Sequence, residues 1–342
     1  MYVYKVCTLC YYFERMLWVK GIQYFTWKFI RGITLLIGLS ILTFVMMQCS
    51  PIDPITAYVG GDTSLTLEQR QAIEAYWGLD RPPSEQYMTW LGNLLKGDFG
   101  VSKVHGKPVI DIIKEKALAS AALMGISWLL SGLIGFILGV IAAVRKGKLI
   151  DRIIKWIAYV QASIPTFWLG LVLLIIFSVW LKWFPIGISV PIGVASEDVT
   201  LLDRLHHLIL PAVTLSILGI GSVILHTREK MVDVLNSEYV IFAKARGETT
   251  WQIIKNHGLR NVALPAITLH FAYFGELFGG SVLAEQVFSY PGLGSTLTEA
   301  GLKGDLPLLM GIVLISAVFV FVGNMLADLL NAIINPRLKE GI

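Results

Sequence analysis

The chain has 342 residues, of which 55% are hydrophobic and 15% are charged, and its net charge is +4. A mean hydropathy of +0.67 excludes a soluble globular protein and indicates an all-α, polytopic membrane protein. The small positive charge is explained by basic residues that flank apolar segments, so it does not indicate nucleic-acid binding.

Residues 1–31 mix aromatic and basic side chains, which is typical of a cytoplasmic or interfacial segment. A secretory signal peptide is the rival interpretation, but no small-x-small cleavage site follows. Cys7 and Cys10 form a single Cys-x-x-Cys without a second pair, so we expect no metal site there.

Six apolar segments are long enough to cross a bilayer, because a hydrocarbon layer of ~30 Å needs roughly 20 helical residues. The first predicted span occupies residues 32–52, and residues 117–342 hold the remaining five. Only the fifth span contains a charged residue, Glu276. The predicted spans are Gly32 to Ile52, Ala117 to Val144, Trp156 to Leu181, Leu205 to Thr227, Asn261 to Ala284 and Leu306 to Ala327.

The orientation follows from the Lys and Arg residues beside these spans, because cytoplasmic loops collect positive charge. Basic residues precede the first span, join the second to the third, and follow the sixth. With six crossings these segments share one side, so both termini are predicted to be cytoplasmic.

Residues 53–116 form the one sizeable polar segment outside the spans, and we expect an extracytoplasmic insert. Thr66-Leu-Glu-Gln69 has the form of a capping box and predicts a helix that runs to about Trp77. A second helix is expected from Gln86 to Leu95. The insert is too small for a receptor domain, so it is predicted to cover the pore mouth.

Residues 228–260 form a polar loop between the fourth and fifth spans. Helical spacing from Tyr239 predicts a short helix that ends at Gly247, where a left-handed residue is needed. Thr249-Thr-Trp-Gln252 is a second capping box, and we expect a second short helix that runs toward Leu259. The alternative is a solvated loop that contains some helix.

Pro165 removes a backbone donor within the third span and predicts a kink. Glu276 is costly within a span, by ~2.5–3.5 kcal/mol, and therefore needs a partner or a polar cavity. It is either a hydrogen-bonded link between helices or a pathway-lining carboxylate. His270 lies six residues earlier, so a straight helix would place the two on different faces. Small residues at Ser131, Gly135 and Gly139, and at Gly275 and Gly279, predict close helix packing.

No phosphate-binding loop, zinc-protease motif or nucleophile elbow is present in the sequence. We therefore predict no catalytic residues, no cofactor and no enzymatic activity. If the protein drives uphill transport, the energy must come from elsewhere.

Motifs in chain order resemble those of permease subunits of binding-protein-dependent ABC importers, in the family that imports dipeptides, oligopeptides and nickel. The resemblance covers nearly all of the chain after its first twenty or so residues. The motifs are Leu79-Asp80-Arg81-Pro82, Gln86-Tyr87, Gly97-Asp-Phe-Gly100, Ser163-Ile-Pro-Thr-Phe-Trp-Leu-Gly170, Leu210-Pro211-Ala212, Leu259-Arg-Asn261, Glu285-x-Val-Phe-Ser-x-Pro-Gly-Leu-Gly294 and Asp328 to Asn335-Pro-Arg337.

The resemblance implies a six-helix, type I importer permease that works by alternating access in a bacterial or archaeal cell membrane. The implied partners are a second permease subunit, two cytoplasmic ATP-binding subunits and an extracytoplasmic substrate-binding protein. It also implies that the 238–260 segment couples the permease to the ATPases. The family's motif glutamate and final proline are absent, so the implied coupling residues are Ala243, Arg246, Gly247, His257, Leu259 and Arg260.

The cargo is open between a nickel ion or metal chelate and a small peptide. Gly275-Glu276-Leu-Phe-Gly-Gly280 is similar to nickel-type permeases, whereas peptide-type members tend to be uncharged here, so the expectation favours nickel. A secondary transporter or channel is the alternative from another class, and its spans should carry more ion-pathway charges. A membrane-bound assembly subunit is a third alternative and predicts no loss of uptake on deletion.

Overall fold

A computed structural model describes residues 26–58, 66–191, 193 and 198–334. Four helices in this part of the chain are long and apolar enough to cross a membrane: Thr26–Gln48, Val109–Val144, Leu201–Leu235 and Leu306–Leu329. Two bent helix pairs pass the same test, which gives up to six spans. The described residues form no named strand, so the predicted all-α polytopic fold is confirmed. Most of the expected N-terminal segment 1–31, including Cys7 and Cys10, lies outside the described residues.

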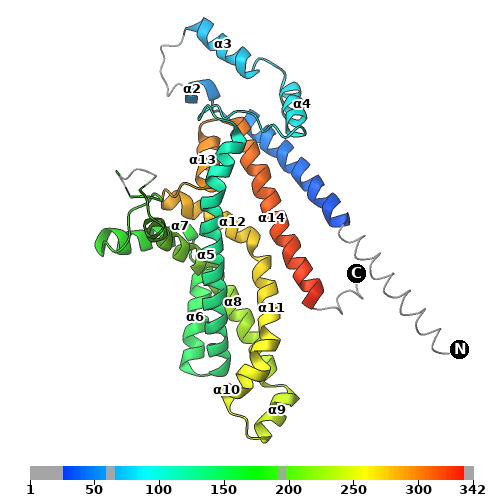
Figure 1. Cartoon of the computed structure of the whole chain (residues 1–342), viewed down its shortest axis with the longest axis vertical. Coiled ribbons are helices and arrows are strands. Elements are labelled where there is room, and N and C mark those ends of the chain that lie inside the picture. Colours follow the sequence, from blue (N-terminus) through cyan, green and yellow to red (C-terminus); the bar gives the residue numbers. More distant parts are fainter. Residues whose placement is uncertain (1–25, 59–65, 192, 194–197, 335–342) are drawn as a thin grey trace, which may run out of the picture.

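The helices form an elongated bundle with short helices at both ends (Figure 1). At one end lie α2 (Pro54–Tyr58), α3 (Leu67–Trp77) and α4 (Pro83–Leu94). At the opposite end lie α9 (Glu238–Ala245), α10 (Thr250–Ile253) and the turn that joins α5 (Val109–Val144) to α6 (Leu149–Ala162). The basic α5–α6 turn and the 238–260 segment therefore share one end, as the charge pattern predicts. Which membrane face each end occupies stays a prediction.

The insert follows its local sequence signals closely. Thr66 caps α3 with a complete capping box, and Gly78 ends it in the left-handed conformation at φ 66°. These two ends are confirmed at the predicted residues. The second helix, α4, begins at Pro83 rather than Gln86, because a proline fits the first turn of a helix, where no backbone donor is needed.

The most extensive helix contact is between α5 (Val109–Val144) and α8 (Leu201–Leu235). A Cβ added at Gly135 would lie 2.7 Å from Val223, and one at Gly139 would lie 2.7 Å from Thr227. The predicted packing role of these small residues is confirmed. On α12 (Phe274–Val287) the prediction is wrong for Gly279, because a Cβ there would meet no described atom within 4 Å. The neighbouring Gly280 makes the close contact instead, since a Cβ there would lie 2.9 Å from Leu215.

Gly139→Ala is expected to destabilise the bundle by about 1–3 kcal/mol, because the new methyl would overlap Thr227 and a backbone oxygen of α8. Gly125→Ala on the same helix is the matched control, since its Cβ meets nothing within 4 Å. Thermal unfolding of the detergent-purified protein measures both. Equal melting temperatures for the two variants would contradict the proposed packing contact.

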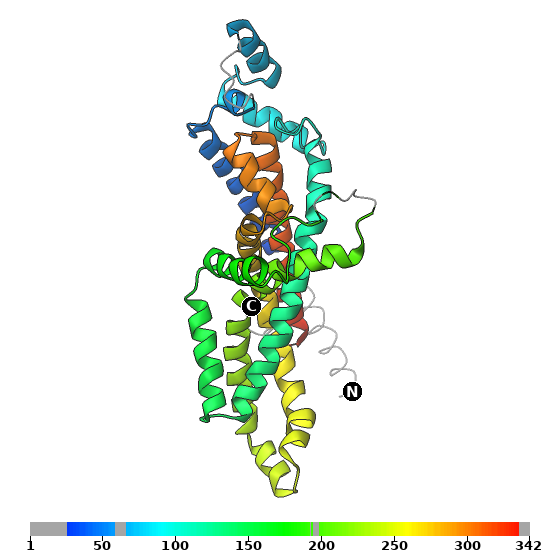
Figure 2. The same ribbon diagram turned by 90° about the vertical axis from the view of Figure 1, so that its left-hand side faces the viewer.

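The third predicted span is broken rather than kinked. Helix α6 (Leu149–Ala162) and α7 (Thr166–Leu174), which continues as the π-helix η1 (Ile175–Trp180), meet at 106°. Pro165 lies at the break and precedes the first residue of α7. As Figure 2 shows, the second half turns across the bundle above α6. The sequence predicted a kink at Pro165 within one continuous span, and the structure has a break of the helix at that residue instead.

The fifth predicted span also has a break, which the sequence analysis did not predict. Helix α11 (Leu259–Ala272) and α12 (Phe274–Val287) meet at 53° around Tyr273. Aromatic rings surround this point: Trp128 lies 4.7 Å from Phe271, and Phe274 lies 5.4 Å from Phe319, measured between ring centroids. Because these partners come from α5 and α14 (Leu306–Ile334), the local sequence of the span did not reveal the break.

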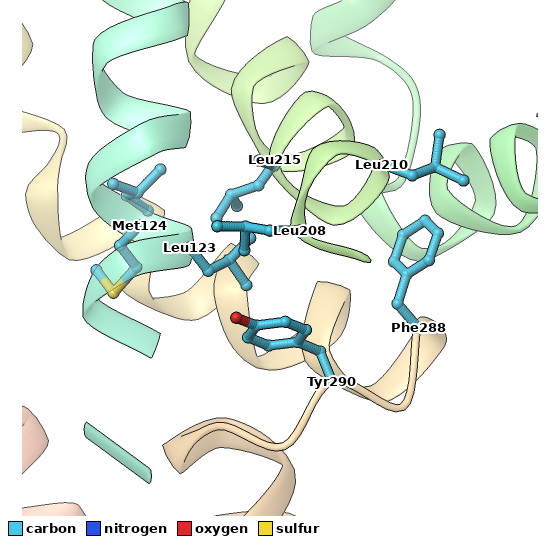
Figure 3. Packing of buried hydrophobic residues seen from close by; sticks show 9 residues of the cluster. Leu123, Met124, Leu208, Leu210, Leu215, Phe288 and Tyr290 are labelled. Carbon is cyan, nitrogen blue, oxygen red and sulfur yellow. The ribbon is translucent and has the colours of Figure 1, made fainter. Parts of the chain in front are cut away.

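The largest buried apolar cluster ties the three central helices together (Figure 3). Leu123 and Met124 come from α5, and Leu208 and Leu215 come from α8. The ring of Phe288, which follows α12, packs against the same cluster. The cluster thereby fixes α12 against the α5–α8 pair.

A fully buried carboxylate, Glu285, joins α12 to the next helix, α13 (Leu293–Leu302). Its oxygens accept hydrogen bonds from the Ser120 hydroxyl at 2.6 Å and the Ser295 amide at 2.9 Å. Ser120 in turn accepts from the Leu293 amide at 2.7 Å. Gly292 lies so close that a Cβ there would be 2.4 Å from the carboxylate. Glu285 therefore acts as a cap for α13, which explains the acidic and glycine positions of the 285–294 motif.

Candidate functional site

A cavity of about 440 Å³ lies between the central helices and the two helix breaks. Its volume is within the ~300–1,000 Å³ typical of small-molecule pockets. Helices α5, α6, α7, α8, α11 and α12 all contribute to its wall. The lining residues that the argument uses are Trp128, Ser131, Gln161, His270, Tyr273 and Glu276.

Both broken helices open onto this cavity. Gln161 and Ile164 come from the α6–α7 break, and His270, Tyr273 and Glu276 come from the α11–α12 break. A break exposes backbone groups that hydrocarbon cannot satisfy, so broken helices within a membrane line aqueous cavities or protein. This arrangement is typical of a substrate pathway in transport proteins.

His270 is nine-tenths buried, at 6% exposed, and is fixed by Trp128. Its Nε2 lies 2.8 Å from the Trp128 carbonyl oxygen, and the Trp128 indole N–H donates to the His270 carbonyl at 3.3 Å. The two rings stack with their centroids 4.6 Å apart. This reciprocal pair anchors α11 to α5 just before the helix break. The sequence considered alone placed His270 on a different face from Glu276 and did not predict this contact.

Glu276 lies in the first turn of α12, at the end of the break rather than in the middle of a helix. Its side chain is exposed on the cavity, and within the described part of the chain it forms no hydrogen bond or ion pair. The expectation that His270 and Glu276 lie on different faces applies to a straight helix. Because the helix bends by 53° between them, both residues line one cavity.

The described residues contain no group of three or more His, Cys, Asp or Glu side chains placed to hold a metal ion. His270 and Glu276 therefore line the cavity without a third such side chain, among the described residues, that would complete a metal site.

The second candidate region is the 238–260 segment at the end of the bundle. Helix α9 ends as predicted: Gly247 is left-handed at φ 86°, its amide donates to Lys244, and the Glu248 amide donates to Ala243. These two bonds form a Schellman motif. Thr249 starts the next helix with a complete capping box, also as predicted.

The second helix does not end near Leu259, which corrects the sequence expectation. Helical structure continues from Thr250 through the π-helix η2 (Ile254–Gly258) into α11, so the segment and the span are one helix to Ala272. The π-turn lies where Gly258 packs against Met231, because a Cβ there would be 3.0 Å from the Met231 sulfur. The helix therefore continues past the expected end, and its π-turn packs against α8 at this point.

Glu248 organises the tip of this segment through two contacts. It accepts from Arg246 at 2.7 Å and lies 3.2 Å from His257 Nε2. Tyr239 adds a contact from the other helix, because Asn261 donates to its hydroxyl at 3.3 Å. Together these side chains hold α9 against the start of the α10–α11 helix.

The predicted coupling residues occupy different environments. The Ala243 side chain is fully buried with Val240 and Ile253, so it supports the segment from inside. Arg246, Gly247 and Arg260 are exposed, whereas His257 and Leu259 are half-buried. The most exposed apolar side chains of the tip are Phe242 at 71% and Trp251 at 68%, and the sequence analysis did not select either.

A second cavity, of about 340 Å³, lies at the opposite end, beneath the insert. Asp53, Glu74 and Lys103 are among its lining residues. Burial lowers the pKa of the Lys103 ammonium to about 8, although the nearby Asp305 carboxylate raises it. Asp305 also accepts from Ser102 at 2.6 Å and from the Val104 amide at 3.0 Å, which fixes the loop before α5 to the start of α14.

Residues 135–340 match the family described as binding-protein-dependent transport system inner membrane component, and residues 22–118 match its N-terminal component. The chain belongs to this family of importer permeases. Among its relatives is the oligopeptide transport system permease protein AppB of Bacillus subtilis (strain 168), which is 39% identical over 91% of this chain and 97% of its own. The dipeptide transport system permease protein DppB of Escherichia coli (strain K12) is 30% identical over 89% of this chain and 95% of its own.

A putative peptide permease protein of Brucella suis biovar 1 is 35% identical over 93% of this chain and 99% of its own. Among solved structures, the inward-facing MetNI methionine ABC transporter matches with a TM-score of 0.51 at 17% identity, covering 65% of this chain and 96% of that chain. This likeness shows the fold, and it places the importer permease in the type I architecture that the sequence predicted.

Proposed function

We propose that this protein is a permease subunit of an ATP-driven importer that moves small peptides across the cytoplasmic membrane by alternating access. The similarity to AppB and DppB along almost the whole chain carries this proposal. The relatives named above are peptide permeases, so the expectation of nickel gains no support from them. The cavity between the two broken helices is the proposed cargo pathway.

A permease of this family acts together with partner subunits, and this chain has exposed surfaces suited to contact with them. The proposed complex contains a second permease subunit, two ATP-binding subunits and an extracytoplasmic binding protein. The exposed Phe242 and Trp251 side chains, flanked by Arg246, are suited to insertion into a groove of an ATP-binding subunit. The insert at the opposite end is the proposed contact for the binding protein.

The continuous helix from Thr250 to Ala272 offers a mechanical link between these two regions. Its 23 residues span roughly 35 Å at ~1.5 Å per residue, from the exposed tip to His270 on the cavity wall. A movement of the tip when the ATP-binding subunits close would therefore tilt the cavity wall. In this mechanism the break at Tyr273 is the point at which α11 moves relative to α12.

Deletion of the gene is expected to abolish most uptake of radiolabelled dialanine and to leave uptake of radioactive nickel unchanged. Expression of the full chain from a plasmid should restore the peptide signal. The same assay with the partner ATP-binding subunit inactivated separates an importer from a stand-alone transporter, because only the former loses uptake. Loss of nickel uptake alone would overturn the peptide assignment.

A further inference from the structure

We propose that the cavity contains a subsite for a positively charged nitrogen of the cargo, formed by the Glu276 carboxylate and the Nδ1 atom of His270. The inference rests on the proposed function, because it assigns the recognised group of a peptide to its ammonium. It names a specificity determinant within the permease itself, in addition to any selection made by a binding protein.

The contact with Trp128 determines which ring nitrogen of His270 carries the hydrogen. A carbonyl oxygen can only accept a hydrogen bond, so the 2.8 Å contact to Trp128 requires that Nε2 carry the hydrogen. In the neutral ring Nδ1 is then an acceptor with a free lone pair. Nδ1 is buried, and no donor among the described residues reaches it. A buried acceptor without a partner is costly, and His270 lines the cavity, so a donor from the cargo or from solvent that reaches Nδ1 would satisfy it.

The charge of the cavity wall comes from Glu276. Glu276 also lines the cavity and forms no ion pair within the described part of the chain. None of the described lining residues is Lys or Arg, so Glu276 is the one formal charge of this wall. A carboxylate without a cation in a confined site attracts positive charge more strongly than in water. A cargo that donates hydrogen bonds and carries positive charge would therefore complement both polar groups.

The remaining cavity wall contains aromatic and neutral polar side chains. Tyr273 lines the same cavity, and the face of an aromatic ring attracts an ammonium group. The Gln161 amide adds a neutral polar group from the α6–α7 break. An ammonium has three donors, which suits a carboxylate, an imidazole acceptor and an aromatic face together. The chemistry of the wall therefore favours the amino end of a peptide over its carboxylate end.

The test measures binding to the complete transporter in lipid nanodiscs without its binding protein. The probes are radiolabelled dialanine, radiolabelled N-acetyl-dialanine, which lacks the ammonium, and n-butylammonium as a competitor. The wild-type transporter should bind dialanine about tenfold or more tightly than its acetylated form, because a charge-assisted hydrogen bond is lost on acetylation. Glu276→Gln should reduce this preference to about twofold or less.

His270→Gln keeps an N–H near the position of Nε2 and removes the Nδ1 acceptor, so dialanine binding should weaken while the protein still assembles. Glu229→Gln is the matched control, because Glu229 is an exposed carboxylate on α8 that does not line the cavity. It should leave both affinities unchanged. A preference for dialanine that survives in Glu276→Gln would overturn the subsite, even if peptide uptake by the wild type upholds the proposed function.

Failure of the peptide function can also be distinguished from failure of the subsite. A wild-type transporter that does not import dialanine, but binds n-butylammonium in a manner that requires Glu276, would refute the peptide function and support the subsite. Absence of Glu276-dependent binding for both dialanine and n-butylammonium would overturn the subsite.

Discussion

Gly247→Val is expected to reduce peptide uptake by about tenfold or more while the protein still inserts into the membrane. Gly247 adopts φ 86°, a conformation that a β-branched residue reaches only with strain of ~1–3 kcal/mol. Relief of that strain would break the Schellman bonds to Ala243 and Lys244 and shift Arg246 and Glu248, which flank Gly247. Uptake of radiolabelled dialanine and the ATPase rate of the same membranes measure the effect.

Gly247→Asn separates backbone conformation from side-chain bulk. Asn tolerates the left-handed conformation far better than Val does, and a Cβ at this position meets no described atom within 4 Å. We therefore expect the Asn variant to keep most of the uptake. Equal loss in both variants would show that bulk at the tip is the cause, and normal uptake in Gly247→Val would remove the turn from the coupling mechanism.

Features that depend on a few neighbouring residues were predictable from the sequence. The capping boxes at Thr66 and Thr249, the end of α3 at Trp77 and the left-handed glycine at 247 occur where the sequence placed them. Such signals are local, because the side chain satisfies backbone groups only three residues away. The apolar length of the spans was equally informative, since bilayer thickness sets it.

Features that depend on distant partners were not predictable. The break at Tyr273 has no proline or glycine at its centre, and it is surrounded by aromatic rings from α5 and α14. The bend also brings His270 and Glu276 into the wall of one cavity, although a straight helix would place them on different faces. Likewise, the second helix of the 238–260 segment continues through Gly258 because Met231 packs against that glycine.

The two carboxylates of α12 differ in burial, and we expect one of them to act in transport and the other to stabilise the fold. Glu276 is exposed on the cavity and has no partner among the described residues, whereas Glu285 is fully buried with hydrogen bonds to two neighbouring elements. The sequence analysis singled out Glu276 because it lies within a predicted span. It treated Glu285 as part of a motif without a physical role, because that residue follows the last predicted residue of the span.

Glu285→Ala is expected to destabilise the folded protein by about 3 kcal/mol or more. It would leave the Ser120 hydroxyl and the Ser295 amide buried without an acceptor, and each unsatisfied group costs ~1–3 kcal/mol. It would also remove the anion at the N-terminus of α13. Glu285→Gln should cost less, because its amide oxygen can still accept from Ser295 while its NH2 group faces Ser120.

Glu276→Ala is the matched control, since it removes the same side chain from the same helix. Its melting temperature should remain near that of the wild type while uptake of dialanine falls, whereas Glu285→Ala should lower the melting temperature and the amount of protein in the membrane together. Fluorescence-detected thermal unfolding and quantitative immunoblotting measure both. A stable Glu285→Ala protein, or a Glu276→Ala protein that unfolds at lower temperature with normal uptake, would contradict this division. The contrast is sharp because the two carboxylates are nine residues apart on one helix and differ mainly in what surrounds them.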